Sequence, residues 1–308
     1  MSRYIGKRLV LMLVTLWVIS TLTFVLMHSI PGDPFSSEKK LPKQTLENLK
    51  AKYHLDEPLP VQYVLYMKNL VMFDLGVSIK SETRTVNEYI SDGFPVSAEL
   101  GAYSMILALV LGIGMGVLAA FRQNKLADYN VMVLAVLGLS VPSFVIAPFF
   151  QKWFGGDWLP LMGWGDFKHA ILPAVALSFL PLALVTRLMR SSMLEVMGQD
   201  YIRTARSKGL PPWRVITRHT LRNAIMPVVT IIGPLAVGIL TGSFVIEHIF
   251  SIPGIGKYFV DSVLNRDYSL IMGITIFYSA LLILVNFLVD LAYGLIDPRI
   301  KVGGKEAN

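Results

Sequence analysis

The chain contains six apolar segments of membrane-spanning length, and they constrain its fold more than any other feature of the sequence. They are Leu9–Met27, Leu100–Phe121, Tyr129–Phe150, Ala170–Met189, Ala224–Ile246 and Leu270–Gly294. Each is close to the ~20 residues that an α-helix needs to cross the hydrocarbon core. Of the 308 residues, 54% are hydrophobic and only 16% are charged, which is unlike a soluble chain. The sequence therefore predicts an all-α membrane protein with six transmembrane helices.

The first apolar segment has the features of a retained helix. Its 19 residues follow Arg3, Lys7 and Arg8, and no small-residue cleavage site follows Met27. A secretory signal has an apolar core of about 7–15 residues and such a site. We therefore expect Leu9–Met27 to be an uncleaved first transmembrane helix.

Positive charge predicts the orientation. Both termini, the second loop and the stretch from Arg187 to Arg222 together carry 16 lysine and arginine residues, whereas the two short loops on the other side carry 4. The positive-inside rule then puts both termini in the cytoplasm. The predicted domain organisation is an N-terminal tail with the first helix (1–29), an extracytoplasmic loop or small cap (30–98), a core of five helices (99–297) with a cytoplasmic loop (191–223), and a cytoplasmic tail (298–308).

The long first loop is the one place where a small extramembrane domain has room. Leu46, Leu49 and Tyr53 mark an amphipathic helix, and residues 61–73 are apolar enough to lie on the membrane or on a partner. The loop carries 8 basic and 9 acidic residues, so it is no electrostatic funnel. A structural cap and a docking surface for an external protein remain alternatives.

The segment Ser191–Asn223 is basic and non-apolar and lies between two spans, so it must face water. Asp200 is expected to cap a short helix over residues 201–208, Gly209 to end it in a left-handed conformation, and Pro212 to begin a second helix. Ile202, Ala205 and Gly209 share one face with small side chains, which we expect to sit in a groove of another protein. The positions predicted to make this contact are Asp200, Tyr201, Ile202, Arg203, Thr204, Ala205, Arg206, Lys208 and Gly209.

The second helix predicts an acidic partner. Arg214, Arg218 and Arg222 recur every four residues, and like charges at this spacing destabilise a helix unless something neutralises them. Anionic lipid of the cytoplasmic leaflet and an acidic partner protein both satisfy this requirement. The net charge of +7 is assigned to such loops and not to nucleic-acid binding.

Prolines and glycines predict how the spans are shaped. Prolines inside spans three to five free backbone groups and kink helices, which is tolerated beside protein or a water-filled cavity. The candidates for kinks along a pathway are Pro142, Pro148, Pro173, Pro181, Pro227 and Pro234. Gly112 and Gly116 form a G-x-x-x-G pattern that favours close helix packing.

Catalytic and metal-binding patterns are absent from the sequence. The chain has no cysteine, five scattered histidines, and no G-x-x-x-x-G-K-[ST], H-E-x-x-H or G-x-S-x-G. The ionisable residues in the spans lie near their ends and form no proton relay: His28, Glu99, Arg187, Glu247, His248 and Asp290. We therefore expect neither an enzyme, nor a metal site, nor a cofactor in this chain. If the chain takes part in active transport, the energy must come from elsewhere.

Several motifs resemble the oligopeptide/dipeptide permease family of ABC importers. Residues 200–210 and 218–227 are similar to the cytoplasmic loop of these permeases, although Arg203 and Thr204 stand where the general pattern has Glu-Ala. The segments 30–35, 242–256, 264–268 and 297–299 extend the resemblance over essentially the whole chain.

The resemblance implies a permease subunit of the bacterial cytoplasmic membrane that forms half of a peptide pathway. It implies four kinds of partner: a homologous six-helix permease, two ABC ATPase subunits that use ATP and Mg, an extracytoplasmic substrate-binding protein, and membrane lipid. The helix at residues 201–209 would couple this chain to an ATPase.

Three alternatives stay open at this point. The same family includes importers of nickel, glutathione and other small solutes. An ion-coupled secondary transporter would need an ion site at mid-membrane and internal repetition, and the sequence shows neither. A scaffold or receptor that transports nothing would lack a water-filled path through spans three to five.

Overall fold

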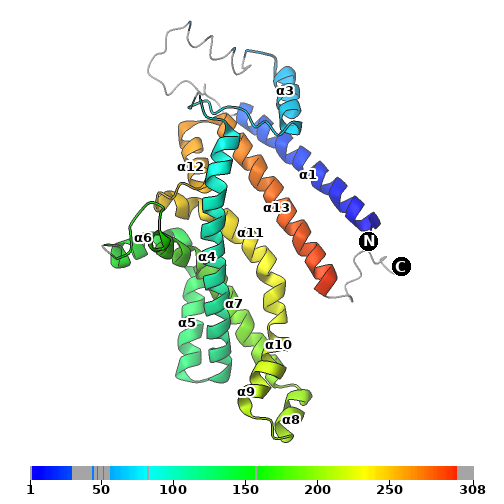
Figure 1. Cartoon of the computed structure of the whole chain (residues 1–308), viewed down its shortest axis with the longest axis vertical. Coiled ribbons are helices and arrows are strands. Elements are labelled where there is room, and N and C mark those ends of the chain that lie inside the picture. The colour runs from blue at the N-terminus through cyan, green and yellow to red at the C-terminus, as the bar shows by residue number, and fades with distance from the viewer. Residues whose placement is uncertain are drawn as a thin grey trace. The chain divides into compact units, whose positions relative to one another are not determined.

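The computed structural model describes residues 2–29, 44, 47, 51, 56–81, 83–156 and 158–296. Within these residues it is helical, and its only β-type pairing is an isolated bridge between Val77 and Thr85. The helices of the first part are α1 (Ser2–Ser29), α3 (Leu59–Val71), α4 (Val86–Phe121), α5 (Leu126–Ser140), α6 (Ser143–Phe154) and α7 (Phe167–Met197). The basic segment holds α8 (Asp200–Ser207), α9 (Pro212–Arg214), a π-helical turn (Val215–Thr220) and α10 (Leu221–Ala224). The last helices are α11 (Met226–Ile249), α12 (Ile255–Asn265) and α13 (Tyr268–Ile296) (Figure 1).

Among the described residues, four helices are long and apolar enough to cross a membrane: Ile5–Ser29, Val86–Phe121, Phe167–Met197 and Tyr268–Val289. Two bent helix pairs raise the number to 6 if each pair is one span. Leu46, Leu49, Tyr53, the side chain of Asp290 and residues 297–299, on which some sequence predictions fall, lie outside the described residues.

The chain divides into two compact units. One comprises residues 1–94 and 258–308, and the other residues 95–257. The helix α4 passes from the first unit into the second at Pro95, which lies inside it.

In the first unit α1 and α13 lie side by side and run in opposite directions (Figure 1). The helix α3 is held against α1 by a Tyr63–Thr21 hydroxyl contact of 2.9 Å and a Gln62–His28 contact of 3.0 Å. Phe24 of α1 also stacks on Tyr66 of α3. The other face of α3 leaves apolar side chains such as Val64 and Val71 exposed. This exposure agrees with the expectation of an apolar surface at residues 61–73.

A buried carboxylate organises the other end of α13. Asp267, which is 2% exposed, precedes this helix and accepts the N–H of Leu270 at 3.1 Å. It also accepts the N–H of Ile79 at 3.1 Å and the hydroxyl of Ser78. The loop before α4 is thereby fixed to the start of α13.

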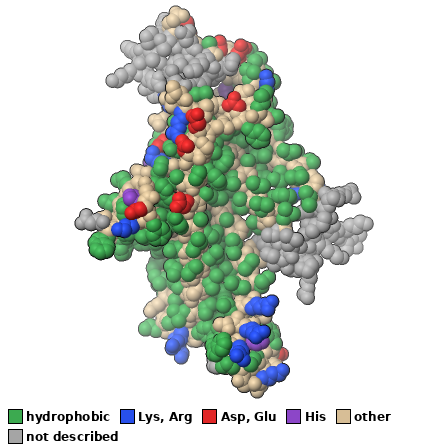
Figure 2. Space-filling model, in the orientation of Figure 1, with side chains coloured by type: hydrophobic (Ala, Val, Ile, Leu, Met, Phe, Trp, Pro, Cys, Tyr) green, Lys and Arg blue, Asp and Glu red, His purple; other side chains and the backbone are tan. Residues whose placement is uncertain are grey.

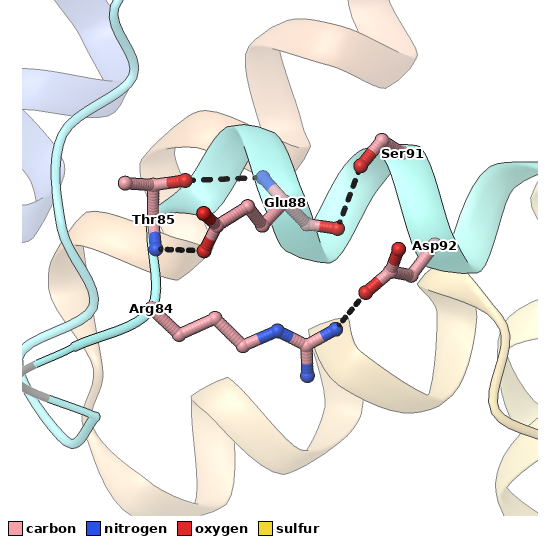
Figure 3. A network of polar contacts seen from close by, with 5 residues as sticks. All are labelled: Arg84, Thr85, Glu88, Ser91 and Asp92. Atoms are coloured by element: carbon pink, nitrogen blue, oxygen red, sulfur yellow. Dashed lines mark hydrogen bonds and ion pairs between the residues drawn. The ribbon is translucent and has the colours of Figure 1, made fainter.

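The start of α4 is fixed by reciprocal capping. Thr85 Oγ1 accepts the N–H of Glu88 at 3.2 Å, and Glu88 Oε2 accepts the N–H of Thr85 at 3.0 Å (Figure 3). This is the T-x-x-E capping box, which satisfies two N–H groups at a helix N-terminus. Arg84 pairs with Asp92 two turns into the helix and lies over the Tyr89 ring at 4.0 Å. The helix therefore begins well before the apolar span at Leu100.

The second unit is built around α7, against which α5, α6, α10 and α11 pack. Close approach of α4 depends on glycine: a Cβ on Gly112 would lie 2.8 Å from Val185 Cγ1, and one on Gly116 would lie 2.6 Å from Met189 Cβ. The predicted packing role of this G-x-x-x-G is confirmed.

A bidentate ion pair joins α5 to α7. Arg190 Nε and Nη2 donate to the two carboxylate oxygens of Asp128 at 2.6 and 2.7 Å. The Asp128 side chain is 4% exposed, and it also accepts the N–H of Asn124 at 2.9 Å. Guanidinium and carboxylate match as two parallel hydrogen bonds, so the pair fixes both spacing and rotation of the two helices.

The third predicted span is not one straight helix. The helices α5 and α6 meet at an angle of 113°. Val141 is extended (φ −95°, ψ 118°) because the ring of the following Pro142 disfavours helical geometry, and Pro142 caps α6. A milder bend of 46° separates α10 from α11, where Pro227 lies in the first turn.

The capping box predicts a local effect on α4. Replacing Thr85 by Ala removes one cap and is expected to cost about 1 kcal/mol. Hydrogen–deuterium exchange of the Val86–Tyr89 amides should speed up about fivefold. Thr85→Ser, which keeps the hydroxyl, serves as the control, and unchanged exchange in Thr85→Ala would contradict this account of the helix start.

The Asp128–Arg190 pair predicts a larger effect. Asp128→Ala leaves a largely buried guanidinium without its counter-charge and is expected to cost about 3–5 kcal/mol. Asp92→Ala breaks an exposed pair and should cost only about 0–1 kcal/mol. Thermal unfolding of the detergent-solubilised protein measures both. A double replacement, Asp128→Leu with Arg190→Leu, should recover more than half of the loss, and equal melting temperatures for the two single variants would argue against the pair's role.

Candidate coupling segment and groove

The basic segment contains a short helix with well-defined ends. The N-cap of α8 is Gln199 and Asp200 is the first helical residue, so the helix begins one position earlier than the sequence predicts. Asp200 still favours this end, because a carboxylate in the first turn complements the helix dipole. The helix ends at the C-cap Lys208, and Gly209 adopts φ 73°, the predicted left-handed conformation.

The apolar face of α8 is buried within this chain. Ile202 is 0% exposed and Ala205 6%, and both pack on Val215 of the π-helical turn, with Val196 and Leu210 at the edge. The expectation that Ile202 and Ala205 lie in a groove of another protein is therefore wrong. Periodicity identified the apolar face correctly, but the partner that covers it is the neighbouring helix of the same chain.

The opposite face of α8 is polar and exposed. It presents Arg203, Thr204, Arg206, Ser207 and Lys208. Asp200 is also exposed, and it forms only a loose ion pair with Arg203 at 3.6 Å. This face therefore offers cations and hydroxyls to a partner.

Tyr201 ties α8 to the next helix. Its hydroxyl accepts a hydrogen bond from Asn223 Nδ2 at 2.9 Å, and the ring remains 43% exposed. Gly209 is exposed, and a Cβ added there would meet no atom within 4 Å. A side chain at Gly209 would be strained by its left-handed backbone, at about 1–2 kcal/mol, and not by crowding.

The helix after Pro212 contains a π-helical turn. Leu221 donates its N–H to Ile216 O, and Thr220 Oγ1 donates to Val215 O at 3.2 Å, both five residues back. Such turns occur frequently at functional sites, and no sequence pattern indicated this one. Arg214, Arg218 and Arg222 are all exposed. Figure 2 shows the lysine and arginine side chains gathered over α8, α9 and α10 at the lower end of the view.

A cavity of about 430 Å³ lies at the break between α5 and α6. Three of the six predicted prolines line it: Pro142 at the break, Pro181 of α7 and Pro234 of α11. Its polar groups come from Ser140 and Ser143, and the rest of its wall is apolar. Pro148 and Pro173 lie inside α6 and α7, and Pro227 lies in the first turn of α11, so these three stay candidates for helix shape alone.

A second hollow of about 500 Å³ lies next to this cavity, along α7 and α11. It shares Leu184, Pro234 and Leu235 with the first, and Arg187, Leu188, Ser191 and Ile231 complete its lining. We call the two together the α7–α11 groove. Apart from Arg187, the groove has no charged lining residue.

Glu247, which the sequence places near the end of a span, is a buried carboxylate. Glu247 of α11 is 0% exposed and accepts the N–H groups of Gly256 at 2.8 Å and Lys257 at 3.3 Å. A Cβ on Gly254 would collide with this carboxylate and would lie 2.6 Å from Ser97 Oγ. The Pro253–Gly256 turn thus wraps around Glu247, and its two glycines were the available sequence indication.

In the part of the chain that the structure describes, no group of three or more His, Asp or Glu side chains could hold a metal ion. The geometry offers instead a basic contact surface on α8–α10 and a groove through the core of the same unit.

Comparison with known proteins agrees with this geometry. Residues 112–302 match the family model "Binding-protein-dependent transport system inner membrane component", and residues 1–101 match the N-terminal model of the same kind of membrane component. The chain is 52% identical to the dipeptide transport system permease protein DppB of Bacillus subtilis, over 99% of this chain and 100% of that protein. It is 47% identical to the oligopeptide transport system permease protein OppB of Salmonella typhimurium, over 98% and 100%.

Solved structures show the same fold at low sequence identity. An inward-facing structure of the MetNI methionine ABC transporter matches with a TM-score of 0.56 and 16% identity, covering 68% of this chain and 96% of that chain. A structure of an amino acid ABC transporter with histidines matches with a TM-score of 0.52 and 13% identity, covering 70% and 95%. By sequence and by fold, the chain belongs to the family of binding-protein-dependent transport system inner membrane components, the permease subunits of ABC importers.

Proposed function

We propose that this chain is the permease subunit of an ATP-driven importer of oligopeptides or dipeptides and forms half of the translocation pathway. The observation that carries this proposal is the likeness over nearly the whole chain to permeases named for dipeptide and oligopeptide transport. Nickel, glutathione and other small solutes remain the alternative cargo, because the groove lining does not distinguish among them. The chain is proposed to lack catalytic activity of its own, with ATP and Mg used by separate ATPase subunits.

The proposed contact with an ATPase subunit is the exposed face of α8. Arg203, Arg206 and Lys208 present three cations on a helix whose other face is anchored on Val215. Acidic groups of the ATPase would pair with these cations. The anchored face supports transmission of force, since a push on α8 acts on packed side chains and not on a loose loop.

The proposed topology follows the distribution of charge. Both termini and residues 191–223 face the cytoplasm of a bacterial cell and residues 30–98 face outward, which fits the positive-inside rule. The exposed apolar face of α3 could lie on the outer surface of the cytoplasmic membrane or against a docked substrate-binding protein.

The proposed pathway runs along the α7–α11 groove. One six-helix chain supplies only one wall, so a homologous permease subunit is proposed to supply the other. Pro142 lies at the break between α5 and α6, and Pro181 and Pro234 lie inside α7 and α11 beside the groove, where freed backbone groups can be satisfied by water or by the partner.

Charge reversal tests the coupling contact. In the complete transporter, Arg203→Glu with Arg206→Glu should lower peptide uptake and peptide-stimulated ATP hydrolysis at least about tenfold, because two cations would repel acidic partner groups. The matched control is Arg122→Glu with Lys125→Glu, two exposed cations on the turn between α4 and α5. The control should retain uptake within about twofold, since it meets lipid and no ATPase.

The comparison separates the two acidic partners considered from the sequence. Equal losses in the two double variants would indicate lipid attraction and would contradict an ATPase contact at α8. Peptide uptake by the chain without any ATPase, driven by an ion gradient, would instead establish a secondary transporter.

A further inference from the structure

We propose that Arg187 binds the C-terminal carboxylate of the transported peptide as it passes along the α7–α11 groove. This inference rests on the proposed function, because it assumes that the cargo is a peptide. It assigns a substrate-binding role to one side chain of α7 and predicts that the transporter distinguishes peptides with a free C-terminal carboxylate.

The groove brings Arg187 to the proposed path of the cargo. Leu184, Arg187, Leu188 and Ser191 form one face of α7 by their spacing of three and four residues, and Leu177 and Pro181 continue that face into the neighbouring cavity. At 1.5 Å per residue, the stretch from 177 to 191 is about 21 Å long. That length is about two-thirds of the hydrocarbon core of a membrane.

The charge of Arg187 has no counter-charge within the described residues. The side chain is exposed in the groove, and no ion pair or hydrogen bond is formed by it with residues 2–29, 56–81, 83–156 or 158–296. Arg190, one turn further along the same helix, is held by both oxygens of Asp128. The two arginines thus have different surroundings, since Arg190 forms an ion pair with Asp128 and Arg187 is exposed in the groove.

The exposed guanidinium of Arg187 is placed to bind an anionic ligand. Arg187 lies near the end of the fourth apolar segment, where a guanidinium costs less than at mid-membrane, and ionisable side chains of membrane-spanning helices often line substrate or ion paths. Arg187 lies about 15 Å from the end of α7 at Met197, counted at 1.5 Å per residue. The surrounding lining is apolar except for Ser191, so the guanidinium dominates recognition in this part of the groove.

A peptide C-terminus fits the guanidinium in both charge and shape. The planar fork of arginine binds a carboxylate through two parallel N–H···O bonds. Every linear peptide with a free C-terminus carries that carboxylate whatever its side chains are. A contact of this kind suits a path that accepts many sequences, and it leaves the apolar walls to meet the variable side chains.

Uptake by the complete transporter tests the proposal. Initial rates are measured with ATPase subunits, partner permease and binding protein present, for trialanine and for trialanine amide, which lacks the carboxylate. Each variant is expressed relative to the unaltered transporter for the same peptide, so that the preference of the binding protein cancels. Arg187→Gln should lower the relative rate for trialanine about tenfold and that for the amide less than about twofold, since a charged hydrogen-bonded pair is lost for the first peptide alone. Arg187→Lys, which keeps the charge but loses the fork, should fall between.

A protection assay gives a second, independent measurement that does not need the binding protein. Since the chain has no cysteine, Ser191→Cys introduces a single thiol into the groove beside Arg187. Millimolar trialanine should slow alkylation of this thiol in the assembled transporter at least about threefold, trialanine amide should not, and Arg187→Gln should abolish the protection.

The outcomes distinguish the alternatives. Equal loss of uptake for both peptides in Arg187→Gln would overturn the proposal and point to a contact with the partner permease. Losses that depend on anionic lipid and not on the peptide would overturn it in favour of a lipid headgroup. Absence of protection by trialanine in the Ser191→Cys protein would also overturn it. If the unaltered transporter moved neither peptide, the proposed function itself would fail, which is a separate result.

Discussion

The burial of Ile202 and Ala205 against Val215 is the interaction on which the rest of this structure depends. It turns an eight-residue helix, too short to be stable by itself, into a fixed part of the second unit. With its apolar face covered, α8 can present Arg203, Arg206 and Lys208 in one fixed orientation. A helix attached only by flexible loops would yield to a push, and no displacement would reach the spans.

The packing continues from α8 into the core. Val196, near the end of α7, contacts the cluster around Ile202 and also the larger cluster that contains Met193, Met189 and Val185. Arg187 and Leu184 lie on the same helix, in the lining of the groove. The helix α7 thus connects the proposed ATPase contact to the proposed peptide path. The ion pair between Arg190 of α7 and Asp128 also fixes α5 to α7. This continuity gives a physical route for the proposed coupling.

The sequence predicted the features that depend on local pattern. Hydropathy located apolar segments that form four long helices and two bent helix pairs in the described residues. Gly209 and Pro212 marked the end of one helix and the start of the next, and the G-x-x-x-G at Gly112 predicted close packing. The capping box at Thr85 and Glu88 follows a known spacing and could have been read from the sequence, which would have set the start of α4.

Features that depend on distant residues could not be predicted in this way. Asp128 and Arg190 are 62 positions apart in the sequence, and the residues around each give no indication that the two side chains pair. The periodicity of α8 showed an apolar face but not whether this chain or a partner covers it. Pro142 predicted an interruption, yet the 113° angle is set by how α6 packs against α7. The sequence did not distinguish among the six prolines, and only the fold shows that Pro142, Pro181 and Pro234 line one cavity.

The central claim is that an ATPase subunit binds the exposed face of α8, and site-directed cross-linking tests it most directly. Arg206→Cys gives the otherwise cysteine-free chain one thiol on the exposed face of α8, and Ala205→Cys gives one on its buried face. The account predicts that the thiol at position 206 cross-links to an ATPase subunit in the assembled transporter, that the yield changes with bound nucleotide, and that the thiol at position 205 stays unreactive. Labelling of position 206 from outside the cell, or a complete lack of cross-linking while uptake continues, would contradict it.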